Sequence, residues 1–260
     1  MISGFSHDFS EPLILKSAAL LACLAALHLV SPLFKKFSDP TRMRFISFSG
    51  GFVVSYVFLR LLPGLSESQH SLGALLGKTY TVTPLLDLTI YFVGLLGLLL
   101  FFGLKQWAKK QSMRNPEGRS PEFYVHLSSM ILLNVLIAYT MPLRMQVGSS
   151  YAYLFTVVMA CHFVVVDKSL ERRFPIRFKF IGRYLLALAL AVGWFWAVWD
   201  EPDSVLTVAL LNAFLGGSVL MNVFRNQIPA PDQEFSFLYF VGGSFLGSFL
   251  LGMLAYVQSY

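Results

Sequence analysis

The chain has 260 residues, of which 56% are hydrophobic and only 13% are charged, and its formal net charge is +6. Soluble domains carry about a quarter charged residues, so this composition excludes an ordinary water-soluble domain and indicates an integral membrane protein whose first partner is the lipid bilayer. The cations lie in short connections between apolar runs, so the positive charge reflects membrane topology and does not indicate nucleic-acid binding.

Eight apolar stretches are long enough to cross the bilayer, because a spanning helix needs about 20 mostly apolar residues. The fifth is the shortest and runs directly into Asp167. No connection is long enough to form a separate aqueous domain, so we predict an all-α integral membrane protein with one transmembrane domain over residues 1–260. In chain order the predicted spans are 12–34, 45–63, 84–104, 122–141, 150–167, 179–199, 204–225 and 235–257.

Basic residues alternate between successive connections. The connections after the first, third and fifth spans are rich in Lys and Arg, whereas the others carry only Lys78, Arg144 and a few acidic residues. Basic connections stay on the cytoplasmic side, which predicts that both termini are extracytoplasmic. We expect the protein in the plasma (inner) membrane.

Two segments of fourteen residues resemble each other. GGFVVSYVFLRLLP (50–63) lies in the second span and GGSVLMNVFRNQIP (216–229) in the seventh, and they match at six positions without a gap. Chance similarity between two apolar helices is one explanation, and internal duplication is the other. Because the two spans run in opposite directions, a duplication would give inverted halves, spans one to three and six to eight, around spans four and five, as in many secondary transporters.

Ionisable and amide side chains inside spans indicate a partner or a function, because a charge there costs roughly 2.5–3.5 kcal/mol on insertion scales. We expect Asp87 to pair with Arg60, Arg225 to extend toward the inner surface, and Asp167 to form a solvated ion pair with neighbouring basic residues. No motif of an enzyme is present, so we expect no catalytic residues. The candidates are His28, Arg60, Asp87, His126, Asn134, His162, Asp167, Asn212, Asn222 and Arg225.

Four segments resemble helices of the ZIP (zinc/iron-regulated transporter-like) family of metal transporters. The resemblance implies eight spans, both termini outside, and an inverted arrangement of the first and last three helices. The segments are SGGFVVSYVFLRLLPGL (49–65), LLNVLIAYTM (132–141), CHFVVVDKSL (161–170) and LNAFLGGSVLMNVFRNQIP (211–229), which resemble the second, fourth, fifth and seventh helices.

Most metal ligands of that family have no equivalent in this chain. Of the ligands that the resemblance implies, only Asn134 and His162 remain, and one imidazole with one amide cannot compete with the hydration shell of a divalent cation. Either residue is also explained by a hydrogen bond between helices. The other motif positions carry Arg60, Gly64, Leu133, Ile137, Val165, Val166 and Ala230.

The sequence therefore leaves two functional hypotheses. The first is a ZIP-like protein with a degenerate metal pathway, a pseudo-transporter that serves as a binding, scaffold or regulatory subunit, with a second copy or another membrane protein as partner. The alternative is a secondary transporter of zinc, iron, manganese or another small solute through a rebuilt site, and Arg60 and Arg225 favour an anionic or neutral solute. A divalent metal, zinc above all, is the only cofactor that the resemblance leaves open.

Overall fold

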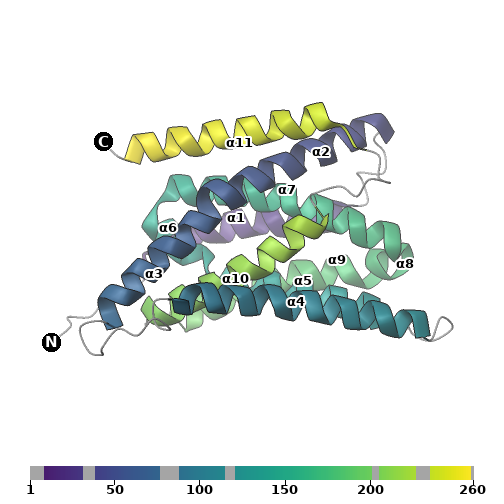
Figure 1. Ribbon diagram of the computed structural model, residues 1–260, viewed down its shortest axis with the longest axis horizontal. Coiled ribbons are helices and arrows are strands. Elements are labelled where there is room, and N and C mark those ends of the chain that lie inside the picture. Colours follow the sequence, from purple (N-terminus) through teal and green to yellow (C-terminus); the bar gives the residue numbers. More distant parts are fainter. Residues whose placement is uncertain are drawn as a thin grey trace.

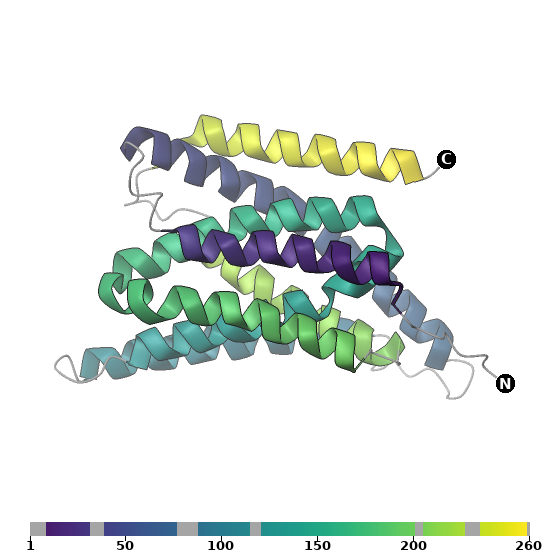
Figure 2. The same cartoon turned by 180° about the vertical axis from the view of Figure 1, so that it is seen from behind.

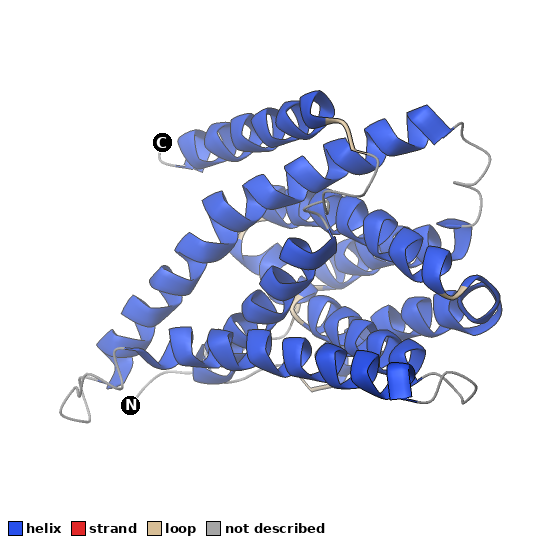
Figure 3. Cartoon of the chain, turned by 45° about the vertical axis from the view of Figure 1, so that its right-hand side comes forward, coloured by secondary structure: helices blue, strands red, loops and turns tan. Residues whose placement is uncertain are grey.

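The computed structural model describes residues 9–31, 39–76, 88–114, 121–200, 205–226 and 235–258. Within these ranges the regular structure is helical and contains no strand (Figure 3). Among the described residues, eight helices are long and apolar enough to cross a membrane, which agrees with the predicted number of spans and indicates an integral membrane protein. They are Glu11–Val30, Asp39–His70, Thr89–Met113, Pro121–Val147, Ser149–Arg173, Pro175–Trp199, Leu206–Arg225 and Phe237–Val257.

Five of the spans are single helices and three are composite. The single ones are α1 (Glu11–Val30), α4 (Thr89–Arg114), α7 (Ser149–Arg173), α10 (Val205–Asn226) and α11 (Phe237–Gln258). The composite ones are α2 (Asp39–Tyr56) with the π-helical turn η2 (Val57–Leu61) and α3 (Leu62–Leu76), α5 (Pro121–Tyr139) with α6 (Met141–Val147), and α8 (Pro175–Arg177) with η4 (Phe178–Gly182) and α9 (Arg183–Trp199).

A proline accompanies each interruption. Pro63 has no N–H to donate to the carbonyl of Leu59, and the helix widens just before it, where the N–H of Leu62 bonds to the carbonyl of Val57. The helix then continues through α3 to Leu76. The prediction that the second span ends at residue 63 and is followed by a loop is therefore wrong for residues 64–76. The fifth span is likewise longer than predicted and ends at Arg173.

The helices pack into one bundle, in which α4 and α11 run along its length and α2, α3 and α10 cross it diagonally (Figure 1). The neighbours in the bundle are α2 with α11, α10 with α4, α9 with both α5 and α1, and α7 with both α2 and α1. Figure 2 shows that α1 begins and α11 ends at the same end of the bundle, as an even number of crossings requires. We call this end the termini end.

Close backbone approach holds α2 against α11. A Cβ atom added at Gly51 would lie 1.9 Å from the carbonyl oxygen of Phe240, and one added at Gly243 would lie 2.1 Å from that of Phe48. Only glycine fits at such distances, which is the packing mode expected between helices in lipid. Gly243 therefore serves the packing of α11 against α2 within the chain.

The same mode holds α10 against α4. A Cβ atom added at Gly217 would lie 1.8 Å from the carbonyl oxygen of Gly94, and one added at Gly97 would lie 2.4 Å from that of Phe214. Both pairs of helices thus depend on glycine at their closest points.

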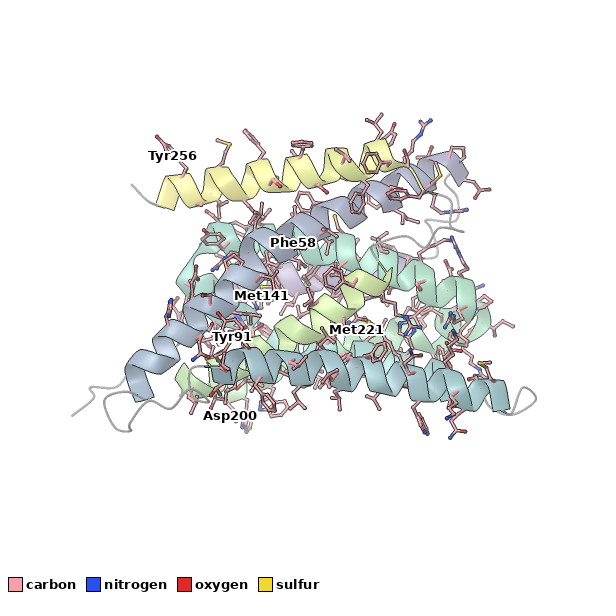
Figure 4. All side chains as sticks on the ribbon, in the orientation of Figure 1. Phe58, Tyr91, Met141, Asp200, Met221 and Tyr256 are labelled. Atoms are coloured by element: carbon pink, nitrogen blue, oxygen red, sulfur yellow. The ribbon has the colours of Figure 1, made fainter. Side chains whose placement is uncertain are left out.

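Large apolar side chains cover the outward surface of the bundle. Trp199 is 92% exposed, Phe245 73% and Tyr256 65%, and Figure 4 shows Tyr256 extending away from the other helices. A soluble protein rarely leaves so much contiguous apolar surface in water. In a bilayer these side chains contact lipid, so the surface agrees with the transmembrane assignment.

Candidate functional site

A buried hydrogen-bond network joins three helices in the core. Nδ1 of His28 on α1 lies 3.0 and 2.9 Å from the two carboxylate oxygens of Asp167 on α7, and Nε2 of His28 lies 3.0 Å from Nδ2 of Asn134 on α5. The exposed fractions of the three side chains are only 1%, 2% and 2%. We call these residues the His28 network.

The geometry of the His28 network fixes where its protons lie. Nδ2 of Asn134 also donates to the backbone carbonyl of Leu186, at 3.1 Å, and a carbonyl only accepts. The amide nitrogen therefore donates to Nε2 of His28, which leaves the imidazole proton on Nδ1. That proton is donated to Asp167. The arrangement gives both ring nitrogens of His28 and the carboxylate of Asp167 a hydrogen-bond partner without a metal ion.

The two retained family positions, Asn134 and His162, have different surroundings. Asn134 is engaged with His28 and Leu186, while His162 is fully buried beside Phe163, with 6.2 Å between the ring centroids. The ring of Phe163 also stacks on the ring of His28, with 4.5 Å between the centroids. Over the part of the chain that the structure describes, no group of three or more His, Cys, Asp or Glu residues could hold a metal ion.

Asp167 differs most from its sequence prediction. The predicted solvated ion pair is wrong, because the carboxylate is buried and bonds to His28, 139 positions away along the chain. The partner comes from another helix, which the basic residues beside Asp167 in sequence do not reveal.

A second buried polar contact lies toward the opposite end from the termini. Lys105 on α4 donates to Oδ1 of Asn222 on α10, and Nδ2 of Asn222 donates to the carbonyl of Ser218 at 2.9 Å. The sequence reading placed Lys105 in a connection, whereas it is helical and only 4% exposed. His126 on α5 is also buried, and its Nε2 finds no hydrogen-bond partner among the residues described.

An open cavity of about 170 Å³ lies toward the termini end, between η2, α3, α6, α7 and α10. Its polar lining includes Tyr56, Arg60, Glu67, Arg144 and Asn212. We call it the Arg60–Arg144 cavity. Both similar segments contribute to its lining, the first through Leu61 and the second through Gly216.

Arg60 and Arg144 reach this cavity with different partners. Arg60 bonds to Glu67 at 3.2 Å and lies over the ring of Tyr151 at 4.9 Å. Its predicted pairing with Asp87 stays a prediction, because Asp87 is outside the described residues. Arg144 bonds to Oδ1 of Asn212 at 3.1 Å.

The guanidinium of Arg144 is held from two further sides. It lies 4.1 Å above the centroid of the Phe155 ring, and its Nε bonds to the hydroxyl of Thr140 at 3.4 Å. The sequence reading had left Arg144 in a connection, and nothing in its immediate sequence marks it as a site residue. Arg225, by contrast, is exposed near the end of α10, and its extension toward the inner surface stays a prediction.

Comparison with protein-family models and with curated proteins finds no match for this chain.

Proposed function

We propose that this chain is a ZIP-like membrane protein whose divalent-metal pathway is degenerate, and that it serves as a non-transporting binding, scaffold or regulatory subunit of a membrane assembly. The observation that carries the proposal is the His28 network. It uses Asn134, one of the two retained family positions, to complete a set of hydrogen bonds that needs no ion. A cation entering from the termini end would also have to pass Arg60 and Arg144, which repel it.

Matched glycine contacts support two inverted halves. In the alignment of 50–63 with 216–229, Gly51 corresponds to Gly217. Each of these glycines meets a backbone carbonyl of a helix in the other half, Phe240 of α11 in one case and Gly94 of α4 in the other. The alignment therefore relates the pair of spans two and eight to the pair of spans seven and three.

A second set of contacts repeats with the same spacing. Three residues before Gly51 and Gly217 lie Phe48 and Phe214, respectively. The carbonyl of Phe48 contacts Gly243, which follows Phe240 by three residues. The carbonyl of Phe214 contacts Gly97, which follows Gly94 by three residues. The correspondence extends to helices outside the aligned segments, which chance similarity of two segments does not explain.

Metal binding tests the main proposal. The purified protein in neutral detergent is heated with zinc, ferrous iron or manganese, and metal uptake is measured in parallel in vesicles that contain it. We expect no specific stabilisation and no uptake, with or without His162→Ala. Saturable stabilisation or uptake that His162→Ala abolishes would overturn the proposal in favour of a working metal transporter.

The orientation is tested by labelling single cysteines with a membrane-impermeant maleimide. In a chain with Cys23→Ala and Cys161→Ala, the exposed positions Ser150 and Lys109 are each replaced by cysteine. If both termini are extracytoplasmic, Ser150→Cys reacts in intact cells, and Lys109→Cys reacts only after permeabilisation. The reverse pattern contradicts the proposed orientation.

The Arg60–Arg144 cavity favours one specific alternative, a secondary transporter of a small anionic or neutral solute. Sites between inverted halves are where such transporters bind their substrates. A protein or second copy that stays bound at a fixed ratio through detergent purification would favour the subunit function. Accumulation of a solute in vesicles, lost in Arg144→Gln, would favour the transporter.

A further inference from the structure

The Arg60–Arg144 cavity holds more positive than negative charge. Two guanidinium groups face it, whereas its lining contains one carboxylate, Glu67, which is 69% exposed and pairs with Arg60. Across the described part of the chain, Arg144 forms no ion pair with a carboxylate, and its partners are the neutral side chains of Asn212, Thr140 and Phe155. Arg144 is half-buried in an open cavity, and its guanidinium has no carboxylate counterion among the described residues, so the site carries an excess of positive charge.

Hydrogen-bond donors converge on the same space. Oδ1 of Asn212 accepts from Arg144, which leaves the amide nitrogen of Asn212 as a further donor at the cavity. Tyr56 belongs to the same lining and is only 6% exposed. Guanidinium, amide and phenol donors around one cavity are the set that binds an oxyanion, because a planar guanidinium can donate two parallel hydrogen bonds to its oxygens.

The size and access of the cavity suit a small ion. A volume of about 170 Å³ is enough for a carboxylate or phosphate group with some remaining water. Access is through the side that Glu67 borders, because this residue is largely exposed.

We propose that the Arg60–Arg144 cavity is a binding site for an oxyanion, a carboxylate or phosphate group, with Arg144 as its principal ligand. Phe155 and Thr140 hold the guanidinium from two sides, so it is oriented before the anion arrives. Glu67 competes with the anion for Arg60 at the mouth of the cavity. The site goes beyond the function proposed above, since it requires neither transport nor a protein partner.

Calorimetric titration of the full chain in neutral detergent tests the site, with sodium phosphate and sodium acetate as probes and sodium chloride at equal ionic strength as reference. We expect saturable binding of one oxyanion per chain and no comparable signal with chloride. Arg144→Gln should weaken binding at least tenfold. Arg144→Lys should bind with intermediate affinity, because lysine keeps the positive charge but cannot donate two parallel hydrogen bonds as a guanidinium does. Arg225→Gln, an exposed arginine elsewhere, is the matched control and should bind as the wild type does.

Glu67→Gln should change the affinity for the anion in the opposite direction. The position is largely exposed, so the substitution should not disturb folding. Removing this carboxylate frees Arg60, so the affinity for phosphate or acetate should rise. A fall in affinity in Glu67→Gln, wild-type affinity in a folded Arg144→Gln, or equal binding of chloride would each overturn the proposal.

The same oxyanion chemistry occurs in free solutes and in lipid headgroups, and a second measurement separates them. Native mass spectrometry is performed on protein from nanodiscs that contain phosphatidylcholine with or without phosphatidylglycerol. Free phosphate that binds equally in both indicates a soluble ligand. One phosphatidylglycerol retained by the wild type and lost in Arg144→Gln indicates a headgroup. The site is refuted if the protein neither binds free phosphate nor retains phosphatidylglycerol.

Discussion

Replacing Gly217 by alanine should force α10 and α4 apart. The new Cβ would lie 1.8 Å from the carbonyl oxygen of Gly94 and 2.6 Å from its carbonyl carbon. Both are backbone atoms, so no change of side-chain rotamer can relieve the clash. The two helices would have to separate by about 1.2 Å to reach 3.0 Å, the shortest distance that real Cβ atoms show.

The expected cost follows from the contacts that such a shift weakens. A gap of 0.5–1 Å already removes about a quarter to a half of the dispersion energy of an atom pair, and overpacking a well-packed site costs roughly 1–3 kcal/mol. The intrinsic preference of alanine for helices offsets about 0.5–1 kcal/mol of this. We therefore expect Gly217→Ala to lower the free energy of unfolding by up to about 2.5 kcal/mol.

Titration with sodium dodecyl sulfate in mixed micelles, followed by far-ultraviolet circular dichroism, measures this difference. Gly51→Ala should behave like Gly217→Ala, because its Cβ would lie 1.9 Å from a backbone oxygen of α11. Gly242→Ala is the matched control, since nothing lies within 4 Å of a Cβ there, and it should be neutral or slightly stabilising. If Gly217→Ala is as stable as Gly242→Ala, the reasoning from backbone contact fails.

Three further predictions concern the buried polar contacts and use the same titration. Asn134→Leu should destabilise by about 1–3 kcal/mol although leucine is more apolar, because it leaves Nε2 of His28 and a backbone carbonyl without a donor; unchanged stability would contradict this. A double-mutant cycle of His28→Leu and Asp167→Leu should give a coupling of about 1–3 kcal/mol, whereas additive effects would show that the two side chains do not interact. Asn222→Leu should cost more than Lys105→Met, because the first leaves a buried ammonium without its acceptor and the second removes the charge; the opposite order would refute that pairing.

The sequence predicts the spans well because an apolar run of helix length is a local signal. It fails at α3, where Glu67, Gln69 and other polar residues follow Pro63. A helix that continues past the apolar run carries no hydropathy signal, and a proline normally marks a helix end. The π-helical turn η2 accommodates Pro63, which pattern analysis of residues 57–61 does not predict.

The candidate sites depend on which helices face each other, and a single sequence does not contain that information. His28 and Asp167 were both candidates, yet their pairing joins the first and fifth spans. Lys105 and Arg144 were counted as connection residues, because the charges that establish the topology were assumed to lie outside the spans. The repeat was the one long-range signal in the sequence, and its second glycines, Gly51 and Gly217, make the closest approaches to the backbone of another helix.

The helix of the second span is longer than the hydrocarbon core of a bilayer. Asp39–His70 comprises 32 residues, and at about 1.5 Å per residue it measures roughly 48 Å, against a hydrocarbon thickness of about 30 Å. Its apolar run, residues 45–63, accounts for only roughly 28 Å of this length, which matches the hydrocarbon core. The polar remainder in α3 therefore extends past the hydrocarbon, and Figure 1 shows α2 and α3 running diagonally across the bundle. Because α3 forms one wall of the Arg60–Arg144 cavity, Glu67 at the mouth of the cavity lies beyond the apolar run, on the side of the lipid headgroups.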